Sequence, residues 1–270
     1  MNRDAAAEAA ELLMAAHRSR KPIDGLPPGL KPADEAAAYR IQAAFVPMIA
    51  RHYGGTRIGR KIGASDPRIQ ASLGIVQPFH GVLLSCFAHP SPARIPADRS
   101  IVRVLEVELA FRVGQDIAPA GAPWDERSIA PKLAAILPAL EVVDSRYTRF
   151  LEAGGLQLAA DNAVAGHWVY GPEQTDWRGL DLADYKVALW VNGELRERGS
   201  SSAVLGNPLT AMAWLANTLA ESGETIEAGE LVTTGTCTKP LAVAEGDEAV
   251  ADLGRLGKVA AAFALPSPPA

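Results

Sequence analysis

A strictly alternating segment near the middle of the chain constrains the fold more than any other feature. Within residues 101–113, large apolar side chains occupy every second position from Leu105 to Val113, and Glu106 and Glu108 lie between them. Successive side chains of a β-strand point to opposite faces, so the pattern predicts a half-buried strand. It also predicts that Glu106 and Glu108 share the polar face of that strand.

The spacing of apolar residues changes once along the chain. Residues 5–17 and about 32–51 carry apolar side chains at helical spacing and are joined by a Pro/Gly-rich connector. From Arg57 onward, short β-type runs alternate with Gly, Pro and Asp, which favours a closed or folded-over β structure over alternating βαβ units. We therefore expect an N-terminal helical region, residues 1–56, and a catalytic mixed-β domain, residues 57–265.

Local signals predict several individual elements. Asn192 and Gly193 form a turn dipeptide that allows positive φ at both positions, so the β-type runs on either side should form a hairpin. Asn207 and Pro208 predict the start of a helix that ends at Gly223. Further strands are expected in the last stretch, at 231–234, 241–244, 248–252 and 259–263.

A helix is also expected directly after Asp125. The aspartate is a good N-cap, and the residues that follow predict a helix running to about Ile136. A short strand should come next, over residues 140–143.

Charge and cysteine content exclude several classes of protein. A net charge of −5 without a basic stripe gives no electrostatic footprint for nucleic acid. Cys86 and Cys237 lie far apart, which supports neither a disulfide framework nor a structural zinc site. No segment has the apolar length of a membrane span, and the first twenty residues lack the pattern of a signal peptide. We therefore expect a cytoplasmic protein without nucleic-acid or membrane partners.

Three glutamates are candidates for a metal site. Glu106 and Glu108 could converge on one ion, although a solvated strand face is a simple alternative. Glu141 lies in the otherwise apolar segment 137–146, where an unpaired carboxylate is costly to bury. A salt bridge to Arg146 or to another cation is the alternative there. Three such oxygen donors suit Mg²⁺ or Mn²⁺ better than zinc.

Lys61 and two histidines are the other candidates for chemistry. Lys61 lies in a short β run between glycines, where its ammonium could donate a proton or bind a substrate carboxylate. The alternative is a surface lysine. His80 and His167 lie in Gly-rich or apolar sequence, and each could equally be a hydrogen-bonded structural histidine. The chain has no Gly-x-Ser-x-Gly nucleophile motif.

Short segments along nearly the whole chain match one known pattern in order. They are Arg60-Lys-Ile-Gly63, Leu73-Gly74 with Pro78 and Gly81, Glu106-Val-Glu-Leu-Ala-Phe111, Leu137 to Arg146, Ala160-Asp-Asn-Ala163, Ala203 to Pro208, Thr234 to Pro240, Gly246-Asp247 and Gly254 to Gly257. Together they resemble the 2-keto-4-pentenoate hydratase and 4-oxalocrotonate decarboxylase group of the fumarylacetoacetate hydrolase superfamily. The resemblance implies an α+β fold, a mixed β-sandwich roll with a small N-terminal helical part.

The resemblance also implies a site. The family's metal ligands fall on Glu106, Glu108 and Glu141, and its catalytic lysine falls on Lys61. Members of the family chelate Mg²⁺ or Mn²⁺, to which the 1-carboxylate and 2-oxo group of the substrate bind. Substrate-binding positions are implied at Leu73, Gly74 and Thr236.

This sequence departs from the family pattern near the expected site. Hydratases carry two acids in the loop Val-Asp-Gln-Pro-Asp-Phe-Gly, whereas residues 75–81 read Ile-Val-Gln-Pro-Phe-His-Gly. His80 could replace the missing acids as a catalytic acid or base, because the ordinary pKa of histidine is close to neutral pH. Hydroxyl residues usual after Ala-Asp-Asn-Ala are replaced by Val164 and Ala165.

The resemblance implies a hydratase-like lyase in the catabolism of aromatic compounds. Lys61 would help to convert a 2-hydroxy-2,4-dienoate to an unsaturated 2-oxo acid, to which water adds. Decarboxylation of a 2-oxo-dioic acid such as 4-oxalocrotonate, and C–C hydrolysis of an acylpyruvate, are the alternative reactions. A non-catalytic paralogue that assembles with an active homologue is the alternative from another class. We expect the chain to form a homo-oligomer.

Overall fold

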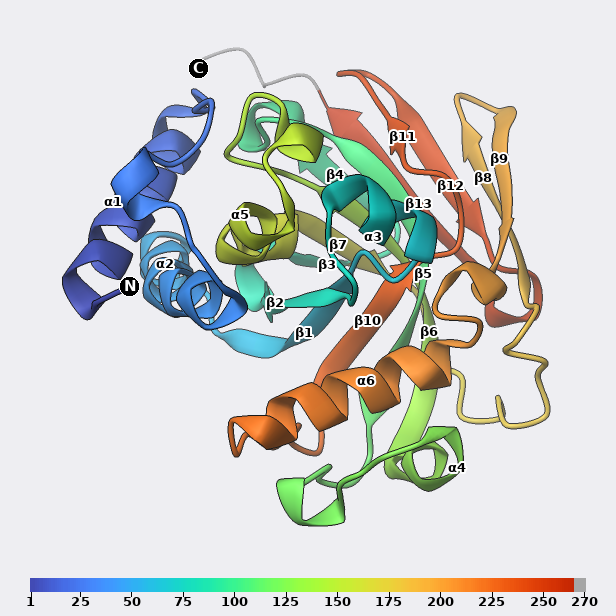
Figure 1. Ribbon diagram of the computed structural model, residues 1–270. Coiled ribbons are helices and arrows are strands. Elements are labelled where there is room, and N and C mark those ends of the chain that lie inside the picture. The colour runs from blue at the N-terminus through green and yellow to red at the C-terminus, as the bar shows by residue number, and fades with distance from the viewer. Residues whose placement is uncertain (265–270) are drawn as a thin grey trace.

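The computed structural model describes residues 1–264, and its strands form two sheets (Figure 1). The larger sheet has eight strands: β1 (Arg57–Gly63), β2 (Phe79–Leu84), β3 (Ala88–Pro90), β5 (Val104–Val113), β6 (Leu133–Val143), β7 (His167–Tyr170), β10 (Leu231–Thr236) and β11 (Leu241–Ala242). Their order is β2-β1-β10-β5-β6-β7-β3, and β11 pairs with β5. The central pair, β5 and β6, is antiparallel over almost its full length.

The smaller sheet has five strands and packs against one face of the larger one. It contains β4 (Ala93–Pro96), β8 (Lys186–Val191), β9 (Glu194–Ser200), β12 (Glu248–Asp252) and β13 (Lys258–Ala264). Its order is β4-β13-β12-β8-β9. Val107, Leu109 and Phe111 of β5 are buried in the core between the two sheets, together with apolar residues of β8, β12 and β13. The mixed β-sandwich roll expected from the resemblance is thus confirmed.

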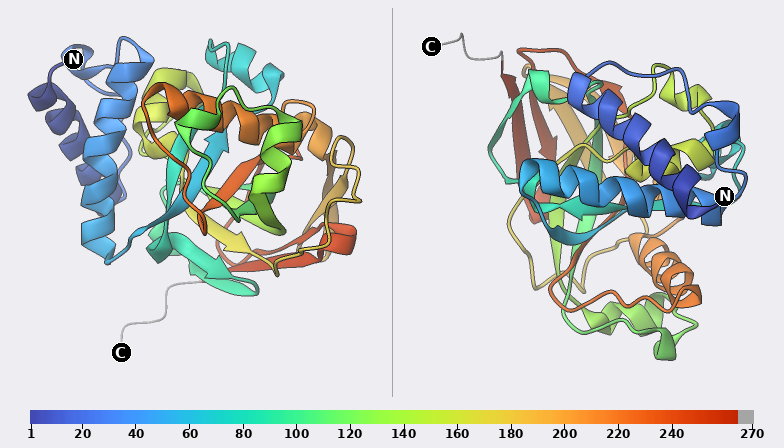
Figure 2. Two further views of the ribbon diagram at one scale, coloured as in Figure 1. Left: turned by 90° about the horizontal axis from the view of Figure 1, so that it is seen from below. Right: turned by 90° about the vertical axis from the view of Figure 1, so that its left-hand side faces the viewer.

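Six α-helices within residues 1–264 pack around the two sheets, and the last of them contributes apolar residues to the same core as β5. They are α1 (Arg3–Ser19), α2 (Glu35–Tyr53), α3 (Pro67–Leu73), α4 (Glu126–Ile129), α5 (Gly155–Ala160) and α6 (Pro208–Glu221). Figure 2 shows α1 and α2 packed together on one side of the molecule. They bury an apolar cluster that also includes residues of α5 and β2. The predicted N-terminal helical part is therefore present. The boundary between residues 56 and 57 stays a prediction, and Leu265, the predicted end of the mixed-β domain, lies outside the described residues.

The turn signals in the sequence correctly predicted two elements. Asn192 and Gly193 both have positive φ, 53° and 78°, in the turn between β8 and β9. Asn207 caps α6 by accepting a hydrogen bond from Leu209 N, and Pro208 is the first helical residue. None of the helices within residues 1–264 is both long and apolar enough to span a membrane.

The helix expected from Asp125 to Ile136 was wrong. Asp125 does cap a helix, but α4 ends at Ile129 and a short 3₁₀ turn follows it. Pro131 explains the early end, because proline has no N–H to donate and restricts the residue before it. The chain then enters β6 at Leu133, so the strand expected over 140–143 is eleven residues long.

Candidate active site

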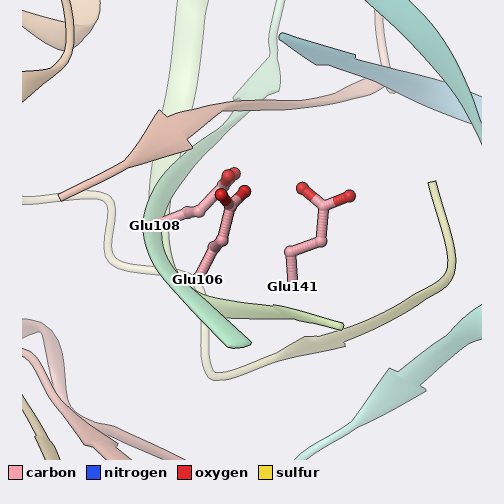
Figure 3. A group of neighbouring side chains, drawn as sticks. All are labelled: Glu106, Glu108 and Glu141. Atoms are coloured by element: carbon pink, nitrogen blue, oxygen red, sulfur yellow. The ribbon is translucent and has the colours of Figure 1, made fainter. Parts of the chain in front are cut away.

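Strand register brings the three candidate glutamates together. Glu106 and Glu108 lie two residues apart on β5, and Glu106 is directly opposite Glu141 on β6. Directly opposed residues of antiparallel strands place their side chains on the same face. Each glutamate has a carboxylate oxygen within 4.8 Å of such oxygens of the other two. Figure 3 shows the three side chains pointing into one space, and we call them the carboxylate cluster.

The carboxylate cluster lies on a covered face of the sheet. Glu108 is 0% exposed and Glu141 1%, whereas Glu106 keeps intermediate exposure. The same face carries a buried apolar group that includes Ala110, Leu137, Ala139, Trp168 and Leu231. A solvated strand face therefore does not explain these glutamates. Three acidic side chains are instead concentrated where water is scarce and charge is costly.

The hydrogen bonds and pKa values of the carboxylate cluster indicate that it favours a bound cation. Thr233 Oγ1 donates a hydrogen bond to Glu108 Oε2. The other oxygen of Glu108 and Oε2 of Glu141 accept no hydrogen bond from any described residue. Burial, followed by repulsion from Glu141, raises the pKa of Glu106 to about 7, and burial with repulsion from both neighbours raises that of Glu108. A divalent cation would relieve this repulsion, and unpaired carboxylate oxygens suit Mg²⁺ or Mn²⁺. The residues present therefore fit such an ion.

Lys61 is part of the same arrangement. Its Nζ lies 2.8 Å from Glu141 Oε1 and donates to the main-chain oxygen of Ala163 at 2.9 Å. The side chain is 1% exposed, so it is no surface lysine. Burial alone would lower the pKa of Lys61, but the negative charge of Glu141, Glu106 and Glu108 outweighs burial and raises the pKa. Lys61 is therefore an ammonium at neutral pH, which can give a proton and hold an anion.

An unusual backbone turn positions the oxygen that binds Lys61. Asn162, Ala163 and Val164 have φ of 53°, 53° and 54°, a left-handed conformation that is costly for residues with a side chain. Gly81, the partner of Lys61 in β2, makes room for this turn. A Cβ at Gly81 would lie 2.5 Å from Asn162 O. The turn therefore sits against β1 and β2 at a distance that only glycine allows.

A buried ion pair holds the residue that directly precedes the left-handed turn of residues 162–164. The guanidinium of Arg146 pairs with the carboxylate of Asp161, and Arg146 Nη2 donates to Asp161 O at 2.6 Å. Asp161 Oδ2 also accepts from Ser145 Oγ and from Arg146 N, both at 2.9 Å. Arg146 is thus not the cation beside Glu141, which is Lys61. The sequence contained Asp161 in a family motif but gave no sign of its partner.

The structure does not bring His80 to the carboxylate cluster. In β2, His80 pairs with Ile62, whereas Lys61 pairs with the next residue, Gly81, so the two side chains lie on opposite faces. The His80 ring stacks on Tyr39, with centroids 4.3 Å apart. Burial and the nearby charge of Arg60 lower the pKa of His80 to about 4. The expected orientation of His80 toward the metal cavity is therefore not observed.

Burial of neutral His80 predicts a pH-dependent stability. The folded-state pKa of about 4 lies below the unfolded value of about 6.5, so stability is present above pH 6.5 and is lost as the pH falls toward 4. The loss should reach roughly 1.4 kcal/mol per pH unit from this one side chain. Urea unfolding of wild type and His80→Gln between pH 7.5 and 5 should show a smaller slope in the variant. His52→Gln, at an exposed histidine, is the control; equal slopes in wild type and His80→Gln would contradict the prediction.

The remaining predicted residues lie in different surroundings. Thr236 pairs with Glu108 in the sheet, and its Oγ1 donates to Thr238 O at 3.0 Å. Leu73 is the last residue of α3 and packs in the apolar cluster of the N-terminal helices. Gly74 caps α3 with a positive φ of 67°. Thr236 therefore borders the carboxylate cluster, and substrate contacts of all three residues stay predictions.

Comparison with known proteins agrees with this geometry. Residues 77–264 match the family model described as fumarylacetoacetate (FAA) hydrolase C-terminal. The chain is 32% identical to 2-keto-4-pentenoate hydratase 2 of Dechloromonas aromatica strain RCB, over 95% of this chain and 96% of that protein. It is 34% identical to a 4-oxalocrotonate decarboxylase of Pseudomonas sp. strain CF600, over 78% of each chain.

A solved structure extends the similarity to three dimensions. The 4-oxalocrotonate decarboxylase of Pseudomonas putida G7, complexed with magnesium and adipate, superposes with a TM-score of 0.90 at 28% identity. The match covers 97% of this chain and 98% of that one. Sequence and fold similarity thus extend along nearly the whole chain, and the family model matches residues 77–264 of it. The chain belongs to the fumarylacetoacetate hydrolase family.

Proposed function

We propose that this chain is a divalent-metal-dependent lyase that acts on unsaturated 2-oxo acids or their dienols. The observation that carries the proposal is the buried carboxylate cluster with the Lys61 ammonium beside Glu141. Similar decarboxylase structures, complexed with magnesium and adipate or with calcium and acetate, support it. We assign Glu106, Glu108 and Glu141 as the residues that would hold Mg²⁺ or Mn²⁺. When bound, the ion supplies positive charge for the substrate carboxylate and for the oxygen at C2.

The residues of the chain then have separate tasks. Thr233 fixes one Glu108 oxygen, which leaves the other free to bind the cation. Lys61 Nζ, held by Ala163 O, gives a proton to the carbon skeleton, and the 2-hydroxyl of the dienol loses its proton and restores the ammonium, which leaves an unsaturated 2-oxo acid. Apolar neighbours such as Ala139 and Trp168 limit access of bulk water. Hydration follows when one water molecule adds to the remaining double bond, which is the reaction named for most of the similar curated proteins.

Decarboxylation of a 2-oxo-dioic acid is the second candidate, and the position of His80 favours it. Water addition requires a group that orients or deprotonates water, and residues 75–81 contribute no carboxylate and turn their histidine to the other face. Decarboxylation needs no such group. The C–C bond to the leaving carboxylate breaks, carbon dioxide departs, the electron pair moves to the oxygen at C2, and Lys61 returns a proton to carbon.

One assay tests the class and separates the two reactions. Purified protein with Mg²⁺ or Mn²⁺ is mixed with 2-hydroxypenta-2,4-dienoate or 4-oxalocrotonate, and ultraviolet absorbance is followed before products are identified. Hydration gives a 4-hydroxy-2-oxo acid, and decarboxylation gives carbon dioxide. Protein treated with a chelator is the control and should be inactive. Consumption of neither acid with either metal would contradict the proposal and would favour a non-catalytic paralogue.

We also propose that the protein works as a cytoplasmic homo-oligomer in the catabolism of aromatic compounds. The names of the similar hydratases and decarboxylases support the type of substrate. Analytical ultracentrifugation of the full chain measures the oligomeric state directly, and a single monomeric species would contradict this part of the proposal.

A further inference from the structure

The free edge of β2 is bound by side chains in place of a neighbouring strand. β2 is the end strand of the larger sheet, so its outer N–H and C=O groups have no strand to pair with among the described residues. His80 N donates to Tyr39 Oη at 3.1 Å, and His80 O accepts from Gln42 Nε2 at 2.8 Å. Val82 N donates to Asn162 Oδ1 at 2.8 Å, and Val82 O accepts from Asn162 Nδ2 at 3.0 Å. Two residues of β2 are therefore held from outside the sheet.

Asn162 joins this edge to the left-handed turn. It is the first residue of the turn, is 3% exposed, and directly precedes Ala163, whose oxygen binds Lys61. Gly81 lies between the two held residues of β2 and opposite Lys61. The side chain of Asn162 thus fixes the turn against the strand beside Gly81. A shift of the turn along β2 would move Ala163 O away from the ammonium.

Gln42 joins the same edge to the segment that leads into the turn. Its Nε2 donates to His80 O and, at 2.7 Å, to Ala159 O in α5, shortly before Asn162. Gln42 is 5% exposed, and hydrogen bonds away from water are strengthened by the low dielectric. We call Gln42 and Asn162 the amide clamp, because their two side-chain amides hold β2, α5 and the turn together.

We propose that the amide clamp positions Lys61 for proton transfer. The clamp keeps the turn at β2, and the turn places Ala163 O where it holds the Lys61 ammonium 2.8 Å from Glu141 Oε1. The inference rests on the proposed function, because it takes Lys61 to be the proton donor. Gln42 belongs to α2, outside residues 77–264 that match the family model. The N-terminal helical part thus contributes a residue to the arrangement of the site.

The test removes each amide and compares the variants with a matched asparagine. Asn162→Ala and Gln42→Met should each lower kcat about 10- to 100-fold, because a displacement of about 1 Å can cost about 100-fold in rate. KM and Mn²⁺ affinity should stay within about threefold of wild type, since the carboxylate cluster keeps its ligands. Asn217→Ala is the control: Asn217 Oδ1 accepts from Trp124 N at 2.7 Å and its Nδ2 donates to Trp124 O at 2.9 Å, the same pair of bonds outside the site. This control should keep wild-type kcat.

A second measurement does not depend on turnover. Acetic anhydride labels only a neutral and accessible amine, so trace labelling followed by mass spectrometry reports how firmly Lys61 is held. With exposed Lys21 as the internal reference, Lys61 should be acetylated about tenfold faster in Asn162→Ala and Gln42→Met than in wild type, as the loss of hydrogen bonds of this kind allows. Asn217→Ala should label Lys61 as wild type does.

Asn162→Gly separates the amide from the backbone conformation. Glycine adopts the φ of 53° found at Asn162 at little cost, so this variant removes the amide without straining the turn. It should be as slow as Asn162→Ala. Wild-type kcat in Asn162→Gly would overturn the role of the amide.

The remaining outcomes separate this proposal from the proposed function. Equal losses of kcat in Asn162→Ala and Asn217→Ala, or unchanged acetylation of Lys61 in both clamp variants, would overturn the positioning role. If wild type converts neither 2-hydroxypenta-2,4-dienoate nor 4-oxalocrotonate, the proposed function fails, and the acetylation rates alone decide whether the clamp holds Lys61. Circular dichroism identifies a variant that does not fold, and the other member of the clamp then decides.

Discussion

Replacing Lys61 with Met should lower kcat by about 10²- to 10⁴-fold, the range that a positioned proton donor contributes. Met keeps most of the volume of the buried side chain but carries neither charge nor proton. Lys61 is the cation beside Glu141, and its pKa is raised by the carboxylate cluster, so the loss affects both proton delivery and substrate binding. Steady-state kinetics with Mg²⁺ at saturating substrate measure the effect, and circular dichroism checks the fold.

Lys61→Arg separates the two tasks of the ammonium. Arginine keeps the positive charge but does not release its proton near neutral pH. If Lys61 donates the proton, Lys61→Arg should be nearly as inactive as Lys61→Met. An Arg variant close to wild type would restrict Lys61 to holding an anion, and an active Met variant would remove it from the mechanism.

Loss of one carboxylate from the cluster should have a comparably large effect on metal binding. Glu141→Gln keeps the shape of the side chain and removes one of three anionic ligands, so Mn²⁺ affinity should fall at least about 100-fold, beyond the 10- to 100-fold cost typical of outer-shell changes. Electron paramagnetic resonance of free Mn²⁺ measures this binding without any assay of activity. Turnover at limiting metal should fall in parallel.

A surface glutamate gives the matched control. Glu173 forms an exposed ion pair with Arg112 and lies outside the carboxylate cluster. Glu173→Gln should bind Mn²⁺ as wild type does. Equal Mn²⁺ affinity in Glu141→Gln and Glu173→Gln would contradict the assignment of Glu141 as a ligand.

Local pattern predicted much of the fold because local chemistry determines it. Alternation identified β5, and the Asn192-Gly193 dipeptide identified the β8–β9 hairpin, since few residues adopt positive φ at both turn positions. The covered face that buries Glu108 was not predictable in this way. It depends on strands that are distant in sequence and on their register. The early end of α4 could have been predicted from Pro131. The prediction instead followed the helical pattern of the surrounding residues and placed the end of the helix too late.

The side chains of the candidate site could be predicted from the sequence. The main-chain groups that contribute to the site could not. The three glutamates and Lys61 were identified from the sequence, partly through the family motifs. The main-chain oxygen of Ala163 has no sequence signature, and nothing about Ala163 or Val164 indicates a left-handed turn. The direction of His80 depends on a register in which its neighbour Gly81, and not His80, opposes Lys61. A shift of one residue decides which face a strand residue occupies.

The left-handed turn has a consequence for how this sequence can diverge. Lys61 is anchored by a carbonyl oxygen of Ala163, and every amino acid supplies such an oxygen. The oxygen that anchors Lys61 is therefore present whatever side chain residue 163 carries. The residue whose identity is constrained is instead Gly81, where any side chain would collide with the turn. Selection for the proposed role of Lys61 would thus act on a glycine that takes no part in the proposed chemistry.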